Sequence, residues 1–134
     1  MNVLKGVISE IQSHEGISLV KLKSNNNTFT SIVLDIPGTA DYLKEDNTVK
    51  IIFKETEVIL SKDLNPSISV QNQILGRIES IKKGVILSQI TISIGEDTIQ
   101  SIITSNACEE LDLKENQDIL ALIKTNEVSL SADD

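Results

Sequence analysis

The chain contains an internal repeat at an offset of seventy residues, and this repeat limits the folds that it can adopt. Gly76 repeats Gly6 and Ile78 repeats Ile8, with no gap in the alignment. Further coincidences at the same offset are Ile81 on Ile11, Thr98 on Thr28, Ser101 on Ser31, Lys124 on Lys54 and Leu130 on Leu60. One fixed offset in a sequence without low-complexity bias indicates the duplication of a module. We therefore expect a first module over residues 1–63, a linker over 64–68 and a second module over 69–134.

The modules are small, and their apolar residues are of one kind. A module of about sixty residues buries too little surface to be stable on its own, so we expect it to pack against its twin or against other subunits. Valine, isoleucine and leucine dominate the apolar residues, while aromatic residues make up only 2% of the 134. An aliphatic core rich in β-branched residues favours strands over helices.

Short runs of alternating apolar and polar residues predict half-buried strands. In the first module they cover residues 3–11, 17–22, 28–34, 49–54 and 57–60, and the last two runs recur over 119–124 and 127–130. One short helix is expected in each module, over 37–43 and over 106–111. Five strands and one helix per module predict an all-β protein made of two tandem five-stranded β-barrels of the OB (oligonucleotide/oligosaccharide-binding) type, which would leave no exposed sheet edges.

Charge and composition exclude several classes of function. A formal net charge of −8 opposes binding to nucleic acid and to anionic membranes, because both depend on lysine and arginine. No apolar run is long enough to span a bilayer and no secretion signal is present, so we expect a cytoplasmic protein. Cys108 and His14 each lack a companion for metal binding or nucleophilic catalysis, which argues against an enzyme and predicts no cofactor. We interpret Cys108 as a buried packing residue.

Several separated motifs of the second module occur in the order and spacing of one known family. They are the opening run over residues 69–76, the segment 102–104, the segment 110–115 and the segment 121–124. With these motifs the module resembles the molbindin family, the Mop or TOBE module that binds molybdate and tungstate. The first module matches the motifs of this family less closely. Two fused copies resemble the di-Mop arrangement, and this resemblance implies a homo-oligomer, a dimer or a trimer, with sites between subunits or modules.

The resemblance also implies a set of residues for binding the oxyanion. Molybdate is a tetrahedral dianion, so its site needs converging N–H groups, hydroxyls and one or two cations rather than carboxylates. No side chain would coordinate the metal directly. The implied residues are Ser69, Gln71, Thr104, Ser105, Ala107, Lys124 and Lys54.

The sequence departs from the family pattern at some of these positions. Gln71 stands where the family commonly has arginine, and Ala107 stands where serine is frequent. In the first module only Lys54 remains of the set. At the positions equivalent to Thr104, Ser105 and Ala107 it has Leu34, Asp35 and Pro37. We therefore expect the site to be built mainly from the second module.

Two hypotheses remain at this point. In the first, the protein binds molybdate or tungstate for storage, buffering or sensing in the cell. In the second, it is an oligomerising interaction module of the same fold that has lost anion binding.

Overall fold

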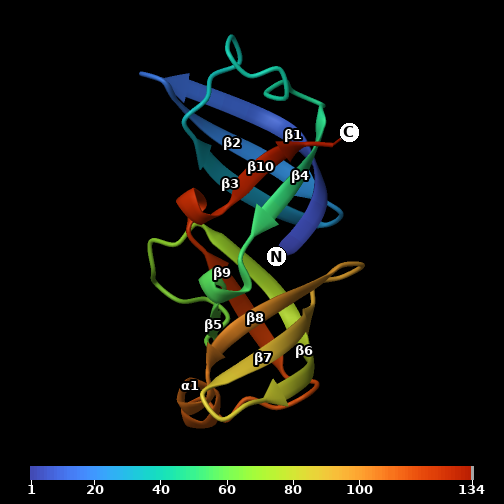
Figure 1. The fold of residues 1–134 in the computed structure, drawn as a ribbon, viewed down its shortest axis with the longest axis vertical. Helices are drawn as coiled ribbons and strands as arrows, with labels where there is room; N and C mark the ends of the chain where they lie inside the picture. The colour runs from blue at the N-terminus through green and yellow to red at the C-terminus, as the bar shows by residue number, and fades with distance from the viewer. Residues whose placement is uncertain (134) are drawn as a thin grey trace.

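The structure, a computed structural model that describes residues 1–133, consists of ten strands in two five-stranded antiparallel sheets (Figure 1). The strands of the first half are β1 (Asn2–His14), β2 (Ile17–Ser24), β3 (Asn27–Val33), β4 (Thr48–Phe53) and β5 (Ile59–Ser61). Those of the second half are β6 (Asn72–Lys83), β7 (Leu87–Ser93), β8 (Thr98–Thr104), β9 (Asp118–Ile123) and β10 (Ser129–Ala132). The expected all-β class is confirmed. Among the described residues, no helix is long and apolar enough to cross a membrane.

The last strand of each half belongs to the sheet of the other half. The strand order is β10-β4-β1-β2-β3 in the first sheet and β5-β9-β6-β7-β8 in the second. Leu130 of β10 lies opposite Ile51 of β4, and Leu60 of β5 lies opposite Ala121 of β9 at the equivalent place. The prediction that each module forms a sheet from its own five strands is therefore wrong. The chain crosses over at two short 3-10 helices, η1 (Glu55–Glu57) and η2 (Thr125–Glu127), which lead from β4 to β5 and from β9 to β10.

Within residues 1–133, α-helix is confined to the second half, where α1 covers Ser105–Glu110. The helix expected over residues 37–43 is wrong, because this segment forms a series of turns, with the Thr39 amide donating to the Ile36 carbonyl. The local sequence explains the difference. Thr104 caps α1 by accepting a hydrogen bond from the Ala107 amide at 3.0 Å, whereas Leu34 at the equivalent position has no side-chain oxygen.

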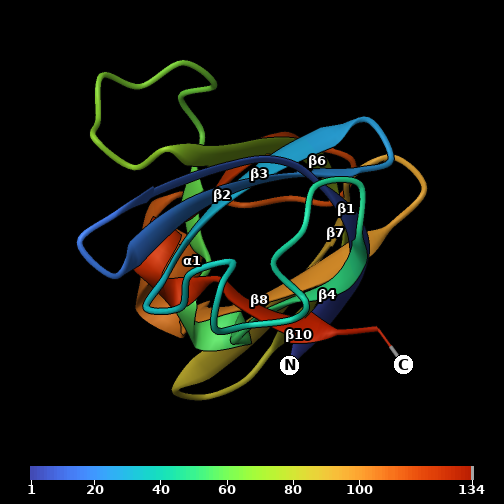
Figure 2. The same ribbon diagram turned by 90° about the horizontal axis from the view of Figure 1, so that it is seen from above.

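The two halves meet through pairs of equivalent hydrogen bonds. The Asn72 side chain donates to the Thr30 carbonyl and accepts from the Thr30 amide, at 2.8 and 2.7 Å. The Asn2 side chain makes the same two bonds with the backbone of Gln100, at 2.9 and 2.8 Å. Since each pair joins one half to the other, the arrangement is close to two-fold symmetric. Figure 2 shows the connector between the halves, which enters β6 at Asn72, looping away from the sheets.

A second pair of equivalent bonds lies at the edge of each sheet. The Ser101 hydroxyl donates to the Val58 carbonyl at 2.7 Å, and the Ser31 hydroxyl donates to the Val128 carbonyl at 2.5 Å. Each serine lies on an edge strand, β8 or β3, and each carbonyl lies just before the strand that arrives from the other half. These bonds tie the exchanged strand to the opposite edge of the sheet that receives it.

The core is aliphatic, as the composition predicts. Buried and exposed residues alternate along the first part of β1 and β6, so that one face of each sheet is apolar. Phe29 and Phe53 are the only buried aromatic residues of the described chain, with ring centroids 6.0 Å apart. Cys108 is buried with a free thiol, in agreement with its interpretation as a packing residue.

Candidate functional site

Three of the residues implied by the family resemblance lie together where β9 ends and β6 begins. Asn72, the first residue of β6, is paired with Ile123, the last residue of β9. The residues just before Asn72 and just after Ile123 are therefore neighbours. They line a hollow of about 360 Å³, whose lining residues are Ile68, Ser69, Val70, Gln71, Lys124 and Thr125. We call this hollow the Lys124 pocket.

The charge and the donors of the Lys124 pocket suit a small anion. Lys124 is its only charged lining residue, and no carboxylate lines it. Within residues 1–133, Lys124 takes part in no ion pair, so its charge is not neutralised by the protein. The wall is fixed in part by the Gln73 side chain, which donates to the Val70 carbonyl at 2.9 Å. Larger hollows elsewhere on the molecule lack this combination: one is lined by Glu45, and another is mostly apolar.

The remaining second-half residues of the implied set form a separate cluster at the start of α1. Thr104 uses its oxygen to accept from the Ala107 amide, so that amide is already engaged. The Ser105 hydroxyl donates to the Gly84 carbonyl at 2.7 Å, and its amide donates to the Ile86 carbonyl at 2.8 Å. Both donors of Ser105 are thus used within the chain. The proton of the Thr104 hydroxyl is not needed for capping, because the cap uses the oxygen as acceptor.

The two clusters lie at opposite ends of the second sheet. Strand β6 begins beside the Lys124 pocket and ends at Lys83, which forms an ion pair with Glu109 of α1 at 2.7 Å. Thr104 and Ala107 line a separate hollow of about 460 Å³ together with Thr56 and Ile59, and no residue lines both this hollow and the Lys124 pocket. Figure 1 likewise shows α1 at the far end of the second sheet from the junction of the two halves. One small anion therefore cannot contact both clusters of the same chain.

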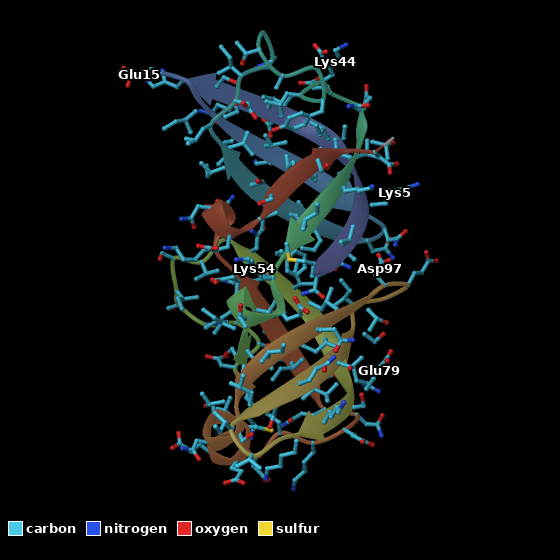
Figure 3. The ribbon with its side chains drawn as sticks, in the orientation of Figure 1. Lys5, Glu15, Lys44, Lys54, Glu79 and Asp97 are labelled. Atoms are coloured by element: carbon cyan, nitrogen blue, oxygen red, sulfur yellow. The ribbon has the colours of Figure 1, made fainter. Side chains whose placement is uncertain are left out.

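Lys54 occupies the place in the first half that Lys124 occupies in the second. Both lysines precede a 3-10 helix with extended backbone, at φ −75° and ψ 146° for Lys54 and φ −61° and ψ 146° for Lys124. In Figure 3, Lys54 lies near the middle of the molecule, at the junction of the halves. The next residue differs, since Glu55 stands where the second half has Thr125. The Glu55 carboxylate lies 2.8 Å from the amino group of Met1, and this hydrogen bond lowers the pKa of Glu55.

The first-half counterpart of the α1 cluster also contains a carboxylate. Asp35 stands at the position of Ser105, and its side chain accepts a hydrogen bond from the Tyr42 hydroxyl at 3.0 Å. Burial, followed by this bond to Asp35 and by its negative charge, raises the pKa of Tyr42 to about 12. Leu34, at the position of Thr104, is 83% exposed, and its side chain has no polar atom. A carboxylate and an apolar side chain make this region unsuitable for an oxyanion.

Sequence reasoning did not single out Thr125. The signal was available, because aligning the repeats places a neutral hydroxyl, Thr125, against a carboxylate, Glu55. Ile68 and Val70 were also missed as lining residues of the Lys124 pocket, since the connector has no regular pattern that would fix its path.

Comparisons with known proteins identify the family. A family model described as the TOBE domain matches residues 68–130. Molybdenum-pterin-binding protein 1 of Clostridium pasteurianum is 40% identical over 67 residues, which are 49% of this chain and 98% of that protein. The chain belongs to the Mop family. It contains two Mop modules in tandem, as the resemblance from sequence indicated.

Two further matches extend over both halves of the chain. Molybdenum import ATP-binding protein ModC of Rhizobium etli is 32% identical over 124 residues, which are 92% of this chain but only 32% of ModC. A crystal structure of the cytoplasmic molybdate-binding protein ModG with molybdate bound has a TM-score of 0.90 at 23% sequence identity. The match covers 98% of this chain and 96% of ModG. The two proteins therefore share the fold.

Proposed function

We propose that this Mop protein binds molybdate or tungstate in the cytoplasm, for storage, buffering or sensing and without catalysing a reaction. The observation that carries the proposal is the Lys124 pocket, where Lys124, Ser69 and Gln71 converge with no carboxylate among the lining residues. The names of its relatives support it, since molybdenum-pterin-binding protein 1 and ModG are both described as binding molybdenum compounds, and ModG as cytoplasmic.

The pocket supplies the kinds of donor that a tetrahedral dianion requires. The Lys124 ammonium provides charge and up to three N–H donors, the Ser69 hydroxyl one donor and the Gln71 amide two. Because Gln71 stands where the family commonly has arginine, one charge-assisted bond is replaced by a neutral one. Such a bond contributes roughly 1.5 to 3 kcal/mol, so we expect affinity about ten- to a hundredfold weaker than with arginine.

We further propose that a second copy of the chain completes the site. Thr104 and Ala107 lie too far from Lys124 of their own chain, while the Thr104 hydroxyl proton is available for an anion. If the α1 end of one copy meets the Lys124 pocket of another, that proton joins the donors of the pocket. Ser105 would contribute only if its bonds to Gly84 and Ile86 opened. This arrangement requires a homo-oligomer, a dimer or a trimer.

The finer architecture belongs to the same proposal. We propose that each sheet curls into a barrel of the OB type, with the exchanged strand beside the opposite edge. The bonds from Ser101 to Val58 and from Ser31 to Val128 support such closure, because each links the two edges of one sheet.

Titration calorimetry of the purified protein with molybdate, tungstate and sulfate tests the function. We expect saturable heat with the two metal oxyanions and weaker or no heat with sulfate. Ligand at a hundred times its dissociation constant should raise the free energy of unfolding by about 2.7 kcal/mol. Absence of both heat and stabilisation with either metal oxyanion would refute the proposal. Sedimentation with and without ligand tests the oligomer: a monomer under saturating ligand would exclude a site shared between copies.

A further inference from the structure

Glu55 follows Lys54 in the first half, and Thr125 follows Lys124 in the second. The backbone around these two residues has the same conformation. The Glu57 amide donates to the Lys54 carbonyl at 3.0 Å, and the Glu127 amide donates to the Lys124 carbonyl at 3.0 Å. Extended backbone at the lysine is followed by one 3-10 turn in each case. Glu55 and Thr125, the first residues of η1 and η2, therefore present different chemistry from equivalent places.

In the second half this residue faces the proposed anion site. Thr125 lines the Lys124 pocket together with Ser69 and Gln71. Its side chain is partly buried, and within residues 1–133 no hydrogen bond of the protein engages its hydroxyl. The hydroxyl group can thus donate its proton to an anion held by Lys124 without breaking a bond of the fold.

In the first half the same place is occupied by a negative charge. The pKa of Glu55 is lowered by its bond to the amino group of Met1, so its carboxylate is ionised at neutral pH. This carboxylate is paired with the Met1 ammonium and has no proton to donate, so it cannot form the hydrogen bond to an anion that a hydroxyl group can form. Lys54 therefore lacks the neutral donor that accompanies Lys124.

We propose that the residue after the lysine contributes to the difference between the halves: Thr125 donates a hydrogen bond to the anion at Lys124, whereas Glu55, which has no proton to donate, offers none beside Lys54. This inference rests on the proposed function and adds a ligand-contacting residue to it. It also assigns a role to one of the differences between the repeats, in addition to the loss of the other implied residues from the first half.

The test compares three substitutions at Thr125 by calorimetric titration with sodium molybdate. Thr125→Val keeps the shape of the side chain but removes the hydroxyl, so we expect the dissociation constant to rise about three- to tenfold. Thr125→Ser keeps the hydroxyl and is expected to bind within about twofold of the parent protein. Thr125→Glu places a carboxylate without an ammonium partner in the Lys124 pocket and should weaken binding by more than about tenfold.

Thr98→Val is the matched control, because Thr98 is an exposed strand residue of β8 that does not line the Lys124 pocket. It should leave the dissociation constant unchanged, and thermal unfolding without ligand verifies that every variant is folded. If the parent protein binds no oxyanion, the proposed function fails. If the parent binds and Thr125→Val binds as tightly as Thr125→Ser, the function stands and the role of Thr125 is wrong. If Thr125→Glu fails to fold, the comparison of Thr125→Val with Thr125→Ser still tests whether the Thr125 hydroxyl binds the anion.

Discussion

The two halves of the molecule share the hydrogen bonds that join them, and they differ in a few local segments. In both, an asparagine at the start of the long strand holds the backbone of the other half, and a serine on the edge strand binds the arriving segment. The differences are local: the second half has α1 and Thr125, whereas the first has a series of turns, Asp35 and Glu55. The bonds that join the halves are therefore kept in both copies, while the residues around the lysines have diverged.

This contrast distinguishes residues that hold the two halves together from residues proposed to bind a ligand. A bond between the halves has an equivalent partner across the near two-fold axis, so loss of either member weakens the same interface. A binding residue has no such partner, because one good site is enough for a function. Comparing equivalent substitutions in the two halves can therefore distinguish structural residues from functional ones.

The largest difference in stability is expected at the paired glycines. A Cβ atom on Gly76 would lie 2.7 Å from the Ser93 carbonyl oxygen and 2.5 Å from Ile92 Cγ2, and the backbone cannot easily move away. On Gly6 the nearest atom is the end of the flexible Ile51 side chain at 2.5 Å, with backbone only at 3.3 Å. We expect Gly76→Ala to destabilise the fold by about 3 kcal/mol and Gly6→Ala by about 1 kcal/mol. Urea unfolding measures both, and equal losses would contradict the difference in packing.

The paired asparagines should give the next largest effect. Asn72→Ala leaves the amide and the carbonyl of Thr30 without partners in a buried site, so we expect a loss of about 2 to 3 kcal/mol. Asn2→Ala removes equivalent bonds from a partly buried site and should be less harmful, at about 1 to 2 kcal/mol. The free energy of unfolding is the measurement for both variants. If Asn2→Ala lost more unfolding free energy than Asn72→Ala, burial would not be what determines which substitution is more harmful.

The two lysines should differ in ligand binding rather than in stability. Lys124→Ala removes the only charge of the Lys124 pocket and should raise the dissociation constant for molybdate about ten- to a hundredfold. Lys54→Ala is the matched control and should change it less than about twofold, because Lys54 does not line the Lys124 pocket. Equal affinity of Lys124→Ala and the parent protein would remove Lys124 from the site.

The smallest expected effect is a dependence on alkaline pH that belongs to the first half. The pKa of Tyr42 rises from 10.0 to about 12, so the folded protein holds the phenol proton more tightly than the unfolded chain does. The resulting stabilisation is complete below about pH 10 and is lost as the pH rises through about 12. Since the side chain is partly exposed, we expect less than about 1 kcal/mol.

Tyr42→Phe is the variant that isolates this effect. Urea unfolding between pH 9 and 11.5 should show a shallower loss of stability than in the parent protein. The second half has Asp112 at the equivalent position, so it contributes no phenol to the transition. An identical pH slope in both proteins would exclude Tyr42 as the source.

Much of the fold could be predicted from the repeat. The fixed offset placed equivalent strands at equivalent positions, and alternation identified their buried faces. The exchange of β5 and β10 could not be predicted, because β4 and β9 offer almost the same pattern of apolar residues. Alternation sets the face and register of a strand but does not say which of two similar neighbours it joins.

The sequence also predicted a set of residues for the candidate site, and the structure brings only some of them together. The motif around Ser69 and Gln71 and the motif at Lys124 lie more than fifty residues apart, and only the pairing of Asn72 with Ile123 brings them together. The sequence also grouped Thr104, Ser105 and Ala107 with them, although in one chain these residues lie at the other end of β6. The helix predicted over residues 37–43 was wrong because the prediction did not consider the helix cap: Leu34 cannot cap a helix as Thr104 does.

The exchange of the last strands has a consequence for the synthesis of the chain. Strand β4 is completed at Phe53, yet the strand that covers its outer edge is β10, over Ser129–Ala132. A nascent chain emerging from the ribosome therefore keeps one edge of its first sheet open until β10, which follows β4 by about eighty residues, has also been made. The first sheet is therefore completed by the last strand to be made, and its uncovered edge depends on the later residues for protection against unwanted strand pairing.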